Sequence, residues 1–441
     1  MPVLRPILAA LVVAFVVTFA ALALSQDESS GRPERPASRQ IGLSAPARPT
    51  ASTGARIASL SKAVEAEPSV PAGYVALAGA YLQGARETAD PTYYARASDA
   101  IERAIARRHD DPAALTVRGT LRLSLHDFRG ALKDARQARA AAPDANGPFP
   151  VLVDALVELG RYEEAEVALQ TLVDRSPGLE SYARVAYLRE LRGDLEGAAQ
   201  ALRLAVSAAG GAGENGAYVA ALLGDLELVR GRRRPARSAY ADALARLPGF
   251  GAAEAGMARL AATGGDRAGA IRRLRPLVGR LPLPQFVVDL GETELAAGRQ
   301  SEARRDLALL DAQQRLLRAS GVEPDAQTAL HEADHGDPRR AVSLGRTAWA
   351  AAPSVRSADA LGWALTRSGQ PEAGLRWARR ALRLGSRDPY FLYHAGIAAQ
   401  RSGRSADARR WLGRALRQAP RFSAYHAPRA ARALRAVERP R

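Results

Sequence analysis

The pentapeptide from His331 to His335 reads His-Glu-Ala-Asp-His and matches a catalytic pattern in both residue type and spacing. Two histidines four residues apart share one face of a helix and can bind zinc, while the intervening glutamate can act as a general base. A glycine and a proline follow within three residues, which places His335 in the last turn of a helix. A third zinc ligand would have to come from another helix. These flanking residues favour a structural role for the segment.

Other motifs for catalysis are missing from the sequence. It has no G-x-G-x-x-G, no phosphate-binding G-x-x-x-x-G-K-[ST] and no G-x-S-x-G. The absence of cysteine excludes disulfides, thiolate catalysis and cysteine-bound metal. We therefore predict a protein that is not an enzyme and has no cofactor or metal site. A zinc-dependent hydrolase using residues 331–335 is the alternative.

The elements that position these residues repeat along the chain. A small residue recurs in steps of 33 or 34 residues, apart from two steps of 38, at Ala131, Ala165, Ala198, Ala236, Ala270, Ala303, Ala341, Gly374 and Ala408. A glycine precedes most of these positions by five residues, at Gly160, Gly193, Gly231, Gly265, Gly298, Gly336, Gly369 and Gly403. The pattern predicts pairs of helices that approach closely at small residues and are joined by a left-handed glycine. The longer steps contain a flexible loop, 207–216, and an extension of a second helix, 311–321.

The segment from Gly160 to Ala165, Gly-Arg-Tyr-Glu-Glu-Ala, resembles the turn and second-helix start of the tetratricopeptide repeat family. The resemblance extends over about 57–423 in roughly ten units, although most first helices lack the usual tryptophan. It implies an all-α fold, a right-handed α-solenoid of helix-turn-helix repeats. It also implies a non-enzymatic scaffold that binds a protein or peptide partner in a concave groove.

In such an array the first helices line the groove. Projecting the repeat onto these helices predicts seven groove residues: Asp154, Tyr187, Asp225, Arg259, Glu292, Trp363 and Tyr393. Acidic side chains among them would bind basic groups of a partner, and the two aromatic residues Trp363 and Tyr393 would serve as apolar anchors.

The N-terminal region differs from the repeats in composition. An apolar run of 18 residues, 7–24, follows Arg5 and would span roughly 27 Å as a helix, close to the thickness of a bilayer core. Residues 1–25 are therefore predicted to be either a membrane anchor or a cleaved signal peptide, which leaves the repeats extracytoplasmic or secreted. A flexible linker at 26–54, the solenoid at 55–423 and a basic capping tail at 424–441 complete the predicted organisation.

The formal net charge of +17 raises the question of an anionic partner. Nearly all of the positive charge is arginine, since Lys62 and Lys133 are the only lysines, and the arginines are scattered through every repeat. This scatter predicts no specific nucleic-acid partner. Binding of an anionic polymer or lipid surface stays open as a further alternative.

Overall fold

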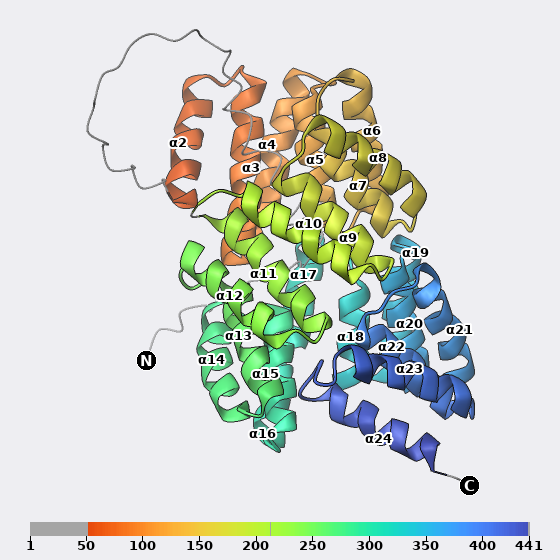
Figure 1. Ribbon diagram of the computed structural model, residues 1–441. Helices are drawn as coiled ribbons and strands as arrows, with labels where there is room; N and C mark the ends of the chain where they lie inside the picture. The colour runs from red at the N-terminus through yellow and green to blue at the C-terminus, as the bar shows by residue number, and fades with distance from the viewer. Residues whose placement is uncertain (1–51, 212, 440–441) are drawn as a thin grey trace, which may run out of the picture.

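The computed structural model describes residues 52–211 and 213–439, and within these ranges the secondary structure is entirely helical (Figure 1). The all-α solenoid is thus confirmed. The predictions for residues 1–51, namely the apolar run and most of the linker, lie outside the described residues. Among the described helices, none combines the length and the apolar character needed to cross a membrane.

Ten helix pairs follow one another in the described residues, preceded by α2 (Thr53–Ala66) and closed by α24 (His426–Glu438). The pairs are α3 (Pro71–Thr88) with α4 (Thr92–Arg107), α5 (Pro112–Ser124) with α6 (Phe128–Ala141), α7 (Pro148–Glu158) with α8 (Tyr162–Arg175), α9 (Leu179–Leu191) with α10 (Leu195–Ala208), α11 (Glu214–Val229) with α12 (Arg233–Arg246), α13 (Gly251–Gly264) with α14 (Arg267–Arg280), α15 (Pro284–Ala296) with α16 (Gln300–Leu307), α18 (Ala326–His335) with α19 (Pro338–Ala351), α20 (Val355–Arg367) with α21 (Pro371–Ala381), and α22 (Pro389–Arg401) with α23 (Ser405–Gln418).

The predicted small residues are the points of closest helix packing. All eight alanines of the second-helix series are fully buried, at 0% exposure. Gly224 of α11 shows why the matching first-helix position is small, because a Cβ atom there would lie 2.4 Å from the ring of Tyr240 in α12. Since real Cβ atoms do not approach ring carbons so closely, the two helices can pack at this distance only around glycine.

The insertion at 311–321 departs from the prediction. The helix is interrupted at Ala308, so α17 (Leu309–Ala319) is a separate helix that begins one residue after α16 ends. Beyond α17, Val322 packs in the apolar cluster of α3, α4 and α5. The backbone oxygen of Glu323 lies 2.7 Å from Nδ1 of His126. The insertion therefore joins the middle of the array to its first repeats.

The array also returns on itself, so that helices α19 to α23 lie beside helices from the middle of the chain (Figure 1). Three turn glycines with positive φ contact carbonyl groups there: Gly160 faces Pro353, Gly193 faces Gly385, and Gly231 faces Gln418. The hydroxyl of Tyr162 accepts a hydrogen bond of 2.8 Å from the backbone N–H of Val355, 193 residues further along.

These contacts predict unequal costs for the same substitution at two turn glycines. Gly160 and Gly298 have similar φ values of 69° and 79°, but a Cβ atom at Gly160 would lie 2.4 Å from the oxygen of Pro353, whereas one at Gly298 meets nothing within 4 Å. We expect Gly298→Ala to cost about 1–2 kcal/mol because of the left-handed backbone. Gly160→Ala should cost about 1–3 kcal/mol more through the clash. Urea unfolding of both variants measures the difference, and equal costs would show that the return contact contributes nothing.

Candidate functional site

A cavity of about 1180 Å³ lies inside the array and is the candidate binding site. It is lined mainly by first helices, among them α3, α9, α11, α13, α18, α20 and α22, so that both ends of the chain contribute to one wall. Exposed residues such as Gly249, Arg280 and Arg318 belong to its lining, and the cavity therefore opens to solvent. Of the seven predicted groove residues, Tyr187, Asp225 and Arg259 line it.

The other four predicted groove residues, Asp154, Glu292, Trp363 and Tyr393, lie elsewhere. Trp363 and Tyr393 are only 2% and 4% exposed, and their ring centroids are 5.5 Å apart. The Trp363 ring also stacks on His394 at 4.3 Å. Neither ring offers the free apolar face that an anchor for a partner needs, because each packs inside the C-terminal repeats.

Asp154 is buried in a pair with Arg184 rather than presented to a partner. Arg184 donates from Nε and Nη2 to the two carboxylate oxygens at 2.9 and 2.7 Å. Burial raises the pKa of Asp154 to about 6, although Arg184 opposes the rise. Removing either partner would leave a buried charge uncompensated. Asp154 therefore joins α7 to α9 within the array.

On the cavity wall, Arg259 holds two carboxylates from neighbouring first helices. It donates to Asp225 of α11 and, at 2.7 Å, to Asp289 of α15. The hydroxyl of Tyr240 donates to Asp225 at 2.6 Å. The negative charge predicted to bind a basic partner group is thus already neutralised by Arg259, and these residues link three consecutive repeats.

A second charged cluster on the wall surrounds Arg356 of α20. Its Nε donates to the hydroxyl of Tyr187 at 2.6 Å, and its guanidinium carbon lies 5.1 Å from that ring. Burial raises the pKa of Glu190 to about 7, with Arg356 opposing the rise. Sequence reasoning missed Arg356, because its partners come from a repeat 169 residues earlier in the chain. No periodic pattern links the two.

Arg86 of α3, also on the wall, has guanidinium donors without a hydrogen-bond partner in the described residues. Its Nε and Nη1 atoms are buried and unpaired. Burial lowers the pKa of Arg86, while the negative charge of Glu214 raises it. A buried guanidinium with unused donors is costly unless a ligand supplies the acceptors. Arg86 therefore places two unused hydrogen-bond donors at one end of the cavity, beside the carboxylates of Glu214 and Glu87.

The pentapeptide at 331–335 does not assemble the geometry of a zinc hydrolase. Helix α18 ends at His335, as predicted. Glu332 turns away to accept a hydrogen bond of 2.7 Å from the backbone N–H of Asp337. His331 lines the cavity, whereas His335 contacts Glu292. The prediction of a left-handed turn at Gly336 is wrong, because the φ angle of this residue is −120°. The Glu332 carboxylate occupies the space beside Gly336.

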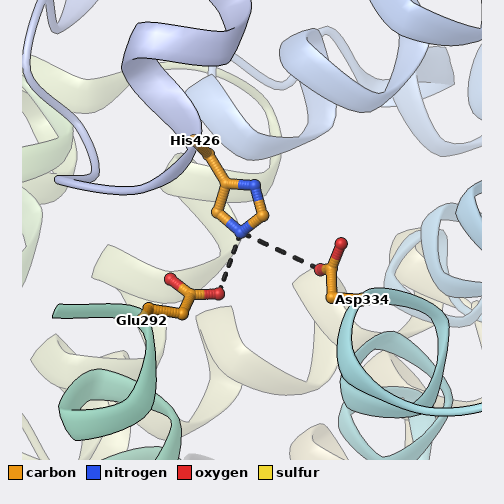
Figure 2. A group of neighbouring side chains, drawn as sticks. All are labelled: Glu292, Asp334 and His426. Carbon is orange, nitrogen blue, oxygen red and sulfur yellow. Dashed lines mark hydrogen bonds and ion pairs between the residues drawn. The ribbon is translucent and has the colours of Figure 1, made fainter. Parts of the chain in front are cut away.

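Glu292 instead lies at the centre of a cluster from α15, α18 and α24 (Figure 2). Its Oε1 is 2.9 Å from Nε2 of His426 and 3.3 Å from Nε2 of His335, and Asp334 Oδ2 lies 3.9 Å from the same His426 nitrogen. Burial disfavours ionisation of Glu292, but His426 and His335 outweigh it and lower its pKa. This cluster has no counterpart in the sequence analysis, because His426 lies beyond the repeats that define the register.

Arginines account for contacts between consecutive repeats throughout the array. Near the ends of second helices they donate to carbonyls that close the preceding unit, and two in first helices contact the previous first helix in the same way. The pairs are Arg107 with Pro68, Arg175 with Pro143, Arg246 with Gly210, Arg280 with Gly249, Arg367 with Ala333 and Arg401 with Thr366. A guanidinium can make several such bonds at once, so the arginine content has a structural use.

Comparison with known proteins supports the predicted repeat over part of the chain. Residues 122–191, which include the turn at Gly160, match the sequence model of the tetratricopeptide repeat family. No protein of curated function matches the chain with statistical significance.

Many solved structures are similar to the chain, and three of them illustrate the range. A thermophilic tetratricopeptide repeat protein of Thermus thermophilus is 24% identical over 36% of this chain and 86% of its own, with a TM-score of 0.34. A chain of the Cut9–Hcn1 hetero-tetramer of APC/C is 13% identical over 88% of this chain and 93% of its own, with a TM-score of 0.36. A tetratricopeptide repeat protein of Parabacteroides merdae is 13% identical over 65% and 98%, with a TM-score of 0.37. With TM-scores below 0.5, these likenesses carry no argument about function.

The raised pKa of Glu190 predicts how stability depends on pH. Its folded-state pKa of about 7 exceeds the ordinary value, so between these values the folded chain binds more protons than the unfolded chain. The stability that Glu190 contributes is therefore present at low pH and is lost as pH rises to about 7. We expect Glu190→Gln to raise stability at pH 8 and to flatten the pH dependence by up to about 1.4 kcal/mol per pH unit.

Urea unfolding of the two proteins at pH 5 and pH 8 measures this change. Glu163→Gln, which removes the same charge from an exposed side chain, is the control. An identical pH profile for Glu190→Gln and the unmodified chain would contradict the assignment.

Proposed function

We propose that this array of tetratricopeptide repeats is a non-enzymatic scaffold that holds a segment of a partner protein in its interior cavity. A fold of this kind serves protein–protein interaction, since its stacked helices present a long concave surface. The observation that carries the proposal is the cavity itself, which both ends of the chain line and which opens to solvent. Its walls combine apolar side chains with charged groups, many of which pair with one another, as Asp225 does with Arg259.

The chemistry of the wall indicates what the partner segment contains. Phe250, Phe286 and Leu283 form an apolar part of the lining. Asp225 is neutralised by Arg259, so it supplies little attraction for a basic side chain. Arg86 has unused donors instead. The proposed ligand is therefore an apolar segment with at least one acidic group, a carboxylate that pairs with Arg86.

Site-specific photocrosslinking in the native host tests this proposal. A photoreactive residue at position 250 lies on the cavity wall, whereas one at position 167 replaces a valine that is 71% exposed and lies away from the cavity. We expect position 250 alone to give a discrete protein adduct. Arg86→Gln should lower its yield at least fivefold, while Arg409→Gln, which removes a charge from the exposed surface, should leave it unchanged. Equal adducts from both positions would refute cavity binding.

We further propose that residues 7–24 hold the scaffold at a membrane, with the repeats on the extracytoplasmic side. The length of the apolar run and the arginine before it support this placement. In fractionated host cells, the full chain should sediment with membranes. When protease is added to the extracytoplasmic side of the membrane, it should digest the repeats. A chain starting at residue 26 should remain soluble inside the cell. If the full chain were expressed and a product lacking the N-terminal apolar run were recovered from the medium, cleavage and secretion would be indicated instead.

A further inference from the structure

The cluster of Glu292, Asp334 and His426 brings three potential metal ligands to one point from distant parts of the chain (Figure 2). One ligand atom of each residue lies within 4.8 Å of the others. The side chains are 15%, 13% and 4% exposed, so the point where they meet is largely shielded from water. His426 Nε2 faces both carboxylates, and a metal ion bound to this nitrogen would compensate their negative charges in place of a proton.

We propose that Glu292, Asp334 and His426 bind one divalent ion of the zinc class and so fasten α24 to the array. Zinc takes nitrogen and oxygen ligands at about 2.0–2.1 Å, and two ligands of a tetrahedral ion are then about 3.3 Å apart. The observed separations of 2.9 Å and 3.9 Å from His426 Nε2 to the two carboxylates bracket this value. The imidazole favours zinc over calcium or magnesium, which prefer oxygen ligands alone.

A neighbouring side chain holds the Asp334 carboxylate in the orientation that such an ion requires. Nε1 of Trp363 donates to Asp334 Oδ1 at 3.0 Å, which leaves Oδ2 directed toward His426. Nε2 of His335 lies 3.3 Å from Glu292 Oε1, the same oxygen that faces His426. Partners of this kind fix metal-binding carboxylates in protein sites. Trp363 is buried and cannot bind a partner, but in this arrangement its indole N–H orients the Asp334 carboxylate.

Three tyrosine rings hold His426 itself. Tyr390, Tyr393 and Tyr425 lie with ring centroids 5.8, 5.4 and 4.9 Å from the imidazole. They restrict rotation of the ring and keep Nε2 facing Glu292. Because Glu292 and His426 are 134 residues apart, an ion between them ties the closing helix to the middle of the chain. This role is structural, and it does not depend on the scaffold function proposed above.

Zinc binding to the purified full chain tests the site. After equilibration with zinc and gel filtration, we expect one zinc per chain by elemental analysis. His426→Gln keeps a side-chain donor for Glu292 but is a poor zinc ligand, and it should weaken zinc binding at least about tenfold. His331→Ala is the matched control, because His331 belongs to the pentapeptide but lies on the cavity wall, and it should bind zinc like the unmodified chain.

Limited trypsin digestion provides a second readout that does not rely on a variant. Helix α24 contains Arg429, Arg432 and Arg435, where trypsin cuts. We expect zinc to slow cleavage at these sites at least fivefold relative to chelator-treated protein. A folded chain that binds no zinc would overturn the proposal. So would zinc retained by His426→Gln, which indicates an adventitious ion, or zinc lost in His331→Ala, which would assign the ion to the histidine pair His331 and His335.

Discussion

Turn glycines lie close to helix ends that follow one superhelical turn later in the chain. The rest of the structure depends on this constraint. At Gly160, Gly193 and Gly231 the chain has positive φ and faces a backbone carbonyl with no room for a side chain. Without these approaches the repeats would form an open spiral with a groove. With them, the first helices surround a cavity, and Arg356 of a late repeat reaches Tyr187 of an early one.

Arginine serves this arrangement in two ways. Between consecutive repeats it donates to backbone carbonyls, and Arg401 supplies in this way a hydrogen bond that the carbonyl of Thr366 lacks in the last turn of α20. Between distant repeats it compensates carboxylates that would otherwise be buried alone, as Arg356 does beside Glu190. Lysine could not do both, because it lacks the planar fork that makes several bonds from one position. The strongly basic composition is therefore compatible with a protein that holds other proteins.

Local periodicity was sufficient to predict the repeating unit and insufficient to predict the site. Ala165 and Ala408 obey a spacing of about one repeat, and their burial follows from packing between adjacent helices. The separation of α16 from α17 at Ala308 escaped prediction, because the residues on both sides of Ala308 are helix-forming. Trp363 fits a groove position by register, yet the later repeats and α24 fold over it. Long-range closure overrides the register at such positions.

The bridge from α17 to the first repeats gives the molecule a mechanical character different from that of a simple stack. Open solenoids stretch and recoil as springs, since each unit touches only its neighbours. Here Val322 packs against α3, α4 and α5, and the backbone of Glu323 contacts His126. These contacts oppose separation of the middle of the array from its first repeats. They therefore also oppose widening of the interior cavity.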